Sequence, residues 1–259
     1  MDDFVEKAVE RVIRSMRDNL GDPITIDDMA RTAMFSKFHF SRMFQRVTGI
    51  SPGRFLSALR LQEAKRLLLA GSLTVADISY LVGYNSIGTF SSRFRMSVGV
   101  SPTTYRQLRG YVSPLAEYRP PPWRGERAVV RGYLHHHATY RPGHIVLGLF
   151  PDRIAQGEPV THTTLHRAGE FTLPHVPVGT WHLLAHSVDV GSGEPEDPYV
   201  AAFGPLTVSA TTAVRPMDMW LRPRRIFDPP ALLAQLDEAM WSTKAQVPGG
   251  ADQAALPGA

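Results

Sequence analysis

The chain has 259 residues, no cysteine, 43% apolar residues, and 28 Lys+Arg against 24 Asp+Glu. At ~100–200 residues per domain, this length predicts two domains. The absence of cysteine excludes disulfide scaffolds, Cys-ligated zinc, iron–sulfur clusters and cysteine nucleophiles. The acidic N-terminus lacks the apolar stretch of a secretory signal, and no apolar run reaches the ~18 residues that span a bilayer. We therefore expect a cytoplasmic protein with no membrane partner.

The net charge of +4 is distributed unevenly along the chain. Residues 1–110 hold 16 Lys+Arg and 10 Asp+Glu, whereas residues 111–259 hold 12 and 14, so the two parts carry +6 and −2. Residues 31–110 carry 12 Lys+Arg and only two acidic residues, Glu63 and Asp77, which gives +10. A local excess of positive charge of this size predicts a polyanionic partner.

An internal repeat organises the first part of the chain. Residues 24–60 recur as residues 73–109, with one residue inserted in the turn of the second copy. Each copy has a capping box that begins a short helix, and a Ser-Pro pair that begins a later one. These signals are Thr25-x-x-Asp28 and Ser51-Pro52, then Thr74-x-x-Asp77 and Ser101-Pro102. The sequence therefore predicts an all-α domain over residues 1–110 with two helix-turn-helix units.

The second helix of the first copy has two contrasting faces. Phe40, Phe44 and Val47 recur at helical spacing and are expected to face the core. The opposite stripe holds the candidate base-facing residues Phe38, Ser41, Arg42 and Gln45, with Lys37 and Arg46 at its edges for the DNA backbone. Arginine can fork to guanine, glutamine can pair with adenine, and an apolar ring can meet a thymine methyl. The alternative is an ordinary solvated face, but the repeat and the basic charge favour the major groove.

The corresponding helix of the second copy is expected to bury Phe90 and Phe94. Its candidate base-facing residues are Ile87, Gly88, Thr89, Ser91 and Ser92. Arg93 and Arg95 are placed for the DNA backbone. Because glycine and serine offer little bidentate chemistry, our hypothesis is that the first copy supplies more of the sequence discrimination and the second more of the salt-dependent anchoring.

Residues 52–70 are predicted to join the two copies as one helix. At 1.5 Å per residue this helix spans roughly 27 Å, less than the ~34 Å between successive major grooves on one side of B-DNA. One chain is therefore expected to reach two groove segments by bending the duplex.

The repeated segments SKFHFSRMFQRVTGISP and YNSIGTFSSRFRMSVGVSPTTYR resemble the DNA-binding domain of the AraC/XylS family of bacterial transcription regulators, over residues 4–110. The resemblance implies base-facing positions for Phe38, Ser41 and Arg42 in the first copy, and for Gly88, Ser91 and Ser92 in the second. It also implies a sequence-specific regulator with double-stranded DNA and RNA polymerase as partners. We expect an activator; the alternative, a repressor that excludes RNA polymerase, stays open at this point. This chain differs from most members in carrying the domain at its N-terminus, so the properties of their sensor domains are not carried over.

Composition changes after residue 110. Only three of the 21 prolines and one of the ten histidines lie before residue 111, and helix interiors exclude proline. We expect a Pro-rich linker over residues 111–127, and then an antiparallel β-sandwich of about seven strands with Greek-key connections over residues 128–227. The expected strands are Ala128–His137, His144–Phe150, Pro159–Leu165, Glu170–Leu173, Thr180–Val190, Ala201–Ala210 and Thr212–Leu221. Their pattern resembles a carboxypeptidase-regulatory-like or prealbumin-like sandwich.

The end of the chain is predicted to form a helix over residues 228–245 and a flexible tail over residues 246–259. Asp228 is expected to cap this helix and Pro229 to take its first position. Its apolar stripe would consist of Leu232, Leu233, Leu236, Ala239 and Met240.

The role of the β domain stays open at this point. It can bind a small-molecule effector, or it can only assemble a homodimer. The alternative from another class is an enzyme or a carbohydrate-binding domain that the helical half targets to DNA. The sequence has no nucleophile elbow and no phosphate-cradling glycine loop, so we expect no catalysis.

Histidines of the β domain are the remaining candidates for chemistry. His135 and His137 would point the same way on a strand, near enough to share a metal, while His136 faces the other side. The alternative is surface histidine without a ligand, which we favour because no third ligand is fixed by the sequence. We therefore expect no metal and no other cofactor.

Overall fold

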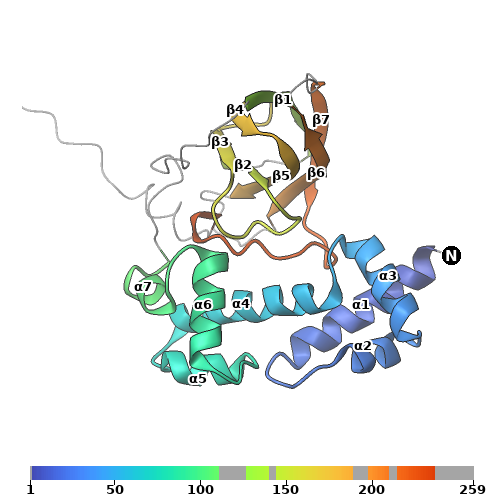
Figure 1. Ribbon diagram of the computed structural model, residues 1–259, viewed down its shortest axis with the longest axis vertical. Helices are drawn as coiled ribbons and strands as arrows, with labels where there is room; N and C mark the ends of the chain where they lie inside the picture. Colours follow the sequence, from blue (N-terminus) through green and yellow to red (C-terminus); the bar gives the residue numbers. More distant parts are fainter. Residues whose placement is uncertain (1, 111–126, 140–143, 189–197, 210–214, 237–259) are drawn as a thin grey trace, which may run out of the picture.

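The computed structural model describes residues 2–110, 127–139, 144–188, 198–209 and 215–236. A helical part comes first in the chain and a strongly curved β sheet follows, which confirms the predicted N-terminal and C-terminal classes. In Figure 1 the sheet lies above the helices, and one long helix runs beneath it. The expected linker, apart from Arg127, and the expected tail lie outside the described residues.

The helical part contains the two predicted units. Each unit comprises a short helix, a tight turn and a second helix, and is followed by a third helix. The helices are α1 (Asp2–Asp18), α2 (Ile26–Ala33), α3 (Lys37–Thr48), α4 (Pro52–Ala70), α5 (Val75–Leu81), α6 (Ile87–Val98) and α7 (Pro102–Gln107). Figure 1 shows α3 and α6 toward opposite ends of α4. None of the helices in the described ranges is long and apolar enough to cross a membrane.

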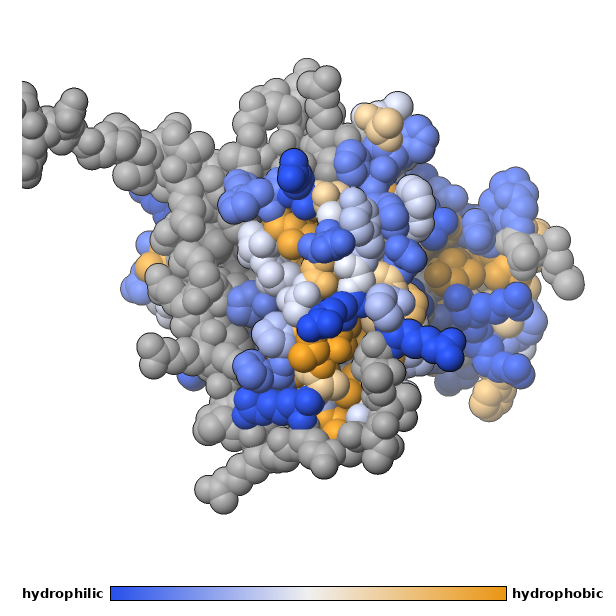
Figure 2. Space-filling model, turned by 90° about the horizontal axis from the view of Figure 1, so that it is seen from above, coloured by the Kyte–Doolittle hydropathy of each residue, from blue (hydrophilic) through white to orange (hydrophobic). Residues whose placement is uncertain are grey.

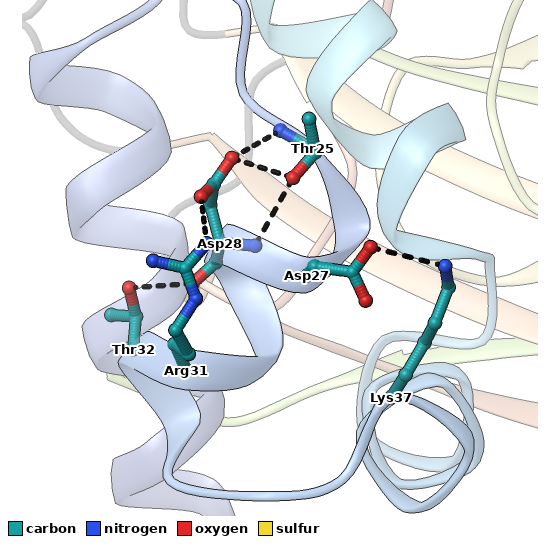
Figure 3. Close-up of polar contacts among 6 residues, drawn as sticks. All are labelled: Thr25, Asp27, Asp28, Arg31, Thr32 and Lys37. Carbon is teal, nitrogen blue, oxygen red and sulfur yellow. Dashed lines mark hydrogen bonds and ion pairs between the residues drawn. The ribbon is translucent and has the colours of Figure 1, made fainter.

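A capping box begins the first short helix of each unit, as the sequence predicts. In α2 the Thr25 hydroxyl accepts from the Asp28 N–H at 3.2 Å, and the Asp28 carboxylate accepts from the Thr25 N–H at 2.9 Å (Figure 3). The Thr25 hydroxyl also donates to the Asp28 carboxylate at 2.6 Å. This hydrogen bond, then the one from the Thr25 N–H, and more weakly Arg31, lower the pKa of Asp28. Thr74 and Asp77 repeat the arrangement at α5. Local hydrogen bonding therefore sets where both units start.

Matching chains of aromatic rings fill the two units. In the first unit, Phe44 meets both Phe40 and Phe55 edge to face. In the second, Phe94 lies against Phe90 in a tilted arrangement and meets Tyr105 edge to face. All six side chains are almost completely buried. The burial of large rings on one side of α3 and α6 leaves their opposite sides toward solvent.

Seven strands form one sheet in the order β3-β2-β5-β6-β7-β1-β4. The strands are β1 (Arg127–His136), β2 (His144–Phe150), β3 (Thr161–Leu165), β4 (Glu170–Pro177), β5 (Gly179–Val188), β6 (Tyr199–Val208) and β7 (Met217–Pro223). Each overlaps one predicted strand, with shifts at the ends.

The sheet departs from the predicted sandwich in its topology. The two edge strands approach each other, since the Thr161 hydroxyl at the start of β3 donates to the Pro174 carbonyl of β4 at 3.2 Å. The seven strands thus curl into a nearly closed barrel around one core rather than into two facing sheets. The expected antiparallel pairing also fails at one place, because β1 and β7 run parallel. Alternation of side chains predicts strands but carries no information on their direction.

Two segments of the β part pack on the helices. In the connection between β2 and β3, Ile154 is 2% exposed and belongs to the core of the helical domain. After β7, Leu232 is buried in that same core, whereas Leu233 packs against Phe150 and Leu184 of the sheet. The Lys65 ammonium of α4 donates to the Leu232 carbonyl at 3.1 Å. The two parts of the chain therefore share buried surface.

The predicted helix over residues 228–245 is not formed in the part that the structure describes. Residues 229–233 are not helical, and Ala234–Leu236 form a single 3-10 turn, labelled η2. Asp228 is engaged elsewhere, because its two oxygens accept from the Arg222 guanidinium at 2.6 Å. The Leu232 and Leu233 N–H groups both donate to the Ala155 carbonyl. The apolar residues are divided between two cores, with Leu232 in the helical core and Leu233 and Leu236 beside the sheet. Ala239 and Met240 lie outside the described residues.

Candidate nucleic-acid interface

Helix α3 presents its predicted outer stripe to solvent. Phe38 is 84% exposed, although the other two phenylalanines of the helix, Phe40 and Phe44, are completely buried. Arg42 and Gln45 are exposed beside it. Ser41 is half-buried, and its hydroxyl donates to the Lys37 carbonyl at 2.9 Å. The stripe thus offers one ring, one guanidinium and one amide on a single helix face.

The edge of this stripe is held by an ion pair with the preceding helix. The Lys37 ammonium lies 3.2 Å from the Asp27 carboxylate of α2, and both side chains are at least half exposed (Figure 3). An exposed pair of this kind is worth only ~0–1 kcal/mol. A DNA phosphate can therefore replace Asp27 as the partner of Lys37 at small cost. Arg46, at the other edge, is also exposed.

Helix α6 repeats this arrangement with smaller side chains. Its N-cap is Ser86, whose hydroxyl accepts from the Thr89 N–H. Ile87, Gly88, Thr89 and Ser92 are exposed, and Ser91 is half-buried. A Cβ added at Gly88 would meet only the Ser86 hydroxyl, 3.7 Å away. The outer face of α6 therefore carries only small side chains near its start, and the space next to Gly88 is accessible.

Positive charge accompanies both helices. Arg93 and Arg95 are exposed on α6. Burial, and then the nearby Arg93 guanidinium, lower the pKa of Arg54 on α4. Arg54 also forms an ion pair with Asp152 in the β2–β3 connection. Exposed cations therefore lie on α6, and the assignment of each residue to a base or a phosphate stays a prediction.

The β part meets the ends of these helices rather than their outer stripes. Both helices end at glycines in the left-handed region, Gly49 with φ 80° and Gly99 with φ 96°. Arg153 packs over Gly49, and the Gly157 N–H donates to the Ser97 carbonyl at 2.8 Å. The stripes on α3 and α6 stay exposed while the β part is docked.

The two histidines considered as metal ligands are not brought together on a strand face. The His135 ring stacks on Trp220, with centroids 4.6 Å apart, and its Nε2 lies 2.7 Å from the Asp218 carboxylate. His137 lies just beyond the end of β1, where its Nδ1 is 2.9 Å from the Thr139 hydroxyl. No group of three His, Asp or Glu side chains that could hold a metal is found within the described ranges. The contacts to Trp220 and Asp218 depend on the parallel β1–β7 pairing, which the sequence did not reveal.

A cavity of about 810 Å³ beside α3 is a further feature that sequence reasoning missed. It lies between α1, the side of α3 and the segment after β7. Its lining residues are Phe4, Val5, Glu6, Phe35, His39, Met43, Arg46, Val47, Arg225 and Phe227. Figure 2 shows hydrophobic side chains gathered where the β part meets the N-terminal helices. The cavity joins residues far apart in the chain, so no local pattern could predict it.

Comparisons with known proteins agree with the helical architecture. The family described as a helix-turn-helix domain matches residues 29–108. The transcriptional activator AarP of Providencia stuartii is 28% identical, over 40% of this chain and 76% of AarP. The lactose operon transcription activator of Staphylococcus xylosus is 29% identical, over 40% of this chain but only 37% of its own length. Both relatives are described as transcription activators.

One solved structure that is similar is a transcriptional regulator from Chromobacterium violaceum, described as containing an AraC-type DNA-binding domain. It is 27% identical and covers 40% of this chain and 93% of its own, with a TM-score of 0.39.

Proposed function

Because the N-terminal part of the chain is an AraC-type helix-turn-helix domain, we propose that the chain is a sequence-specific transcription regulator that inserts α3 and α6 into two successive segments of the major groove. Its partner is double-stranded DNA. Two relatives are activators, and we extend this role to the chain, with RNA polymerase as the protein that it contacts. The β part responds to an effector or assembles a homodimer.

The outer stripe of α3 is the observation that carries this proposal. A guanidinium at Arg42, an amide at Gln45 and a largely exposed ring at Phe38 share one face of a helix that is anchored by buried phenylalanines. Arginine and glutamine are the side chains that make bidentate contacts to guanine and adenine, and a ring can meet a thymine methyl. The face is therefore chemically suited to reading bases as well as to binding phosphates.

The two helices have different tasks in this proposal. α3 supplies most of the base discrimination, because α6 offers only Gly88, two serines and small apolar contacts. α6 supplies salt-dependent anchoring through Arg93 and Arg95, since phosphate contacts release counterions without reading sequence.

The test uses the full chain and a selection of duplexes from a random pool. Affinity for the selected duplex and for a scrambled one is then measured over a series of salt concentrations. Arg42→Ala is expected to cost ~1–3 kcal/mol and to relax preference at one base position. The matched control is Arg131→Ala, which removes the same charge from an exposed position on β1 and is expected to leave base preference unchanged. An affinity that did not fall with salt, or that was equal for both duplexes, would refute the proposal.

The division of tasks has its own test in an operator scan with single substitutions in each helix. Arg42→Ala is expected to change base preference, whereas Ser92→Ala is expected to weaken binding without changing it. The opposite result, with preference lost only in Ser92→Ala, would reverse the assignment.

A further inference from the structure

The cavity beside α3 lies at a meeting point of three segments. α1 contributes Phe4 and Glu6, the recognition helix α3 contributes Met43 and Arg46, and the segment after β7 contributes Phe227 together with Arg225. Its volume of about 810 Å³ falls within the ~300–1,000 Å³ typical of small-molecule sites.

Aromatic rings form much of the cavity wall. Phe4 and Phe35 meet edge to face with centroids 6.0 Å apart, and the His39 ring contacts Phe35 at 4.8 Å. Phe4 is 54% exposed, and Phe35 and Phe227 are only partly buried. Flat ring systems pack well against such walls in offset or edge-to-face geometry. Met43 adds an unbranched, polarizable side chain that adapts to the shape of a ligand.

Charge in the cavity favours an anion. Arg46 and Arg225 contribute two guanidinium groups, against one carboxylate from Glu6. The Arg225 guanidinium lies 6.0 Å from the centre of the Phe227 ring, so a cation and an aromatic surface occur side by side. Guanidinium groups bind carboxylates through paired hydrogen bonds.

We propose that this cavity binds an aromatic carboxylic acid of one or two rings, with its carboxylate at Arg225 and Arg46 and its rings against Phe35 and Phe227. This inference rests on the proposed function only for its regulatory consequence. Arg46 is also a predicted contact to the DNA backbone. A bound carboxylate therefore competes with a phosphate for the same guanidinium and lowers the affinity of the chain for DNA.

The binding test uses the free protein and three probes of matched size. 2-Naphthoate is titrated by calorimetry beside the neutral 2-naphthalenemethanol and the acyl chain decanoate. Naphthoate is expected to bind best, and Arg225→Gln and Phe227→Ala are each expected to weaken it about tenfold. Arg131→Gln, on the exposed face of β1, removes the same charge far from the lining residues and is expected to bind as the unchanged chain does. Circular dichroism verifies that each variant is folded.

Several results would overturn the assignment. They are no detectable binding of naphthoate, equal binding by the alcohol, tighter binding of decanoate, or equal affinity in Arg225→Gln and Arg131→Gln. If Phe227→Ala fails to fold, Arg225→Gln together with the alcohol still tests the site.

The regulatory consequence is tested with the selected duplex. Saturating naphthoate is expected to weaken DNA binding and to reduce the slope of log K against log salt by about 0.9, the contribution of one phosphate contact. By linkage, DNA must weaken naphthoate binding by the same factor. Unchanged DNA affinity at saturation would overturn the competition. If the chain binds DNA but not naphthoate, this inference is refuted and the proposed function is not. If the chain binds naphthoate but shows no sequence-specific DNA binding, the proposed function is refuted and the binding site is not.

Discussion

His186 is expected to make the stability of the protein sensitive to mild acid. It lies on β5, on the same face as Leu184, which packs against Leu233 of the segment after β7. Burial, and then the nearby Arg224 guanidinium, lower the pKa of His186 from 6.5 to about 4, against the opposing effect of the Asp228 carboxylate. The folded protein therefore holds this imidazole neutral at a pH where an unfolded chain would protonate it.

The direction and size of the effect follow from this difference. Between pH 6.5 and about 4 the unfolded state binds one proton more than the folded state at His186, so stability is fully present above pH 6.5 and is lost as the pH falls. The full loss is ~3 kcal/mol, of which ~2 kcal/mol is reached at pH 5. Burial raises the pKa of Asp228, but hydrogen bonds from Arg222 and the Arg225 N–H outweigh it and lower the pKa overall, so the carboxylate stays charged in this range.

The assay is urea unfolding followed by circular dichroism between pH 7.5 and 5. His186→Gln is expected to lose ~2 kcal/mol less than the unchanged chain over this range, because its side chain does not titrate. His136→Gln, at an exposed position of β1, serves as the control and is expected to follow the unchanged chain. A proton NMR titration of the His186 ring, expected to show no midpoint above pH 5, covers the case in which His186→Gln does not fold. Equal pH dependence in both variants, or a midpoint near 6.5, would refute the reasoning.

Three further substitutions test the fold and the interface. Ile154→Ala is expected to leave a cavity in the helical core and to lower the free energy of unfolding in urea by ~2–5 kcal/mol. The control Val129→Ala, at an exposed position, should change this free energy by less than ~0.5 kcal/mol. Equal effects of the two substitutions would contradict the shared core. Gly88→Ala is expected to raise the free energy of unfolding by ~0.5–1 kcal/mol. The same substitution is expected to weaken binding to the selected duplex in an anisotropy titration. Unchanged affinity for the duplex would show that Gly88 is not part of the interface. Asp27→Asn removes the partner of Lys37, so binding to random duplex at low salt should strengthen; weaker binding would show that the ion pair positions Lys37 for DNA.

The helical part could be predicted from the sequence because its signals are local. A capping box such as Thr25 with Asp28 needs only four consecutive residues, and the spacing of Phe40 and Phe44 identifies the buried face of α3 within one turn. Once the buried positions of a helix are known, the remaining positions must face solvent. The candidate residues of α3 and α6 occupy such positions and therefore lie at the surface.

The β part was predicted less completely because its decisive contacts are distant in sequence. Alternation located the strands, but the parallel pairing of Gly132 with Met217 joins two ends of the domain. The failure of the helix after Asp228 has the same origin. Leu232 and Leu233 look like part of one apolar stripe in the sequence, but they pack into two different cores. The cavity beside α3 likewise exists only after the segment that follows β7 has docked.

The fixed length of α4 has a consequence for the shape of the DNA in the proposed complex. α4 has 19 residues and spans ~27 Å, less than the ~34 Å separating successive major-groove entries. The 1.5 Å rise per residue fixes the length of this helix. Contacts from Asp152 to Arg54 and from the Leu232 carbonyl to Lys65 also connect both of its halves to segments of the β part. Under the proposed function the duplex must supply the bend. Base pairs between the two groove segments would then be selected for their deformability, and flexible pyrimidine–purine steps would be favoured where no side chain reaches.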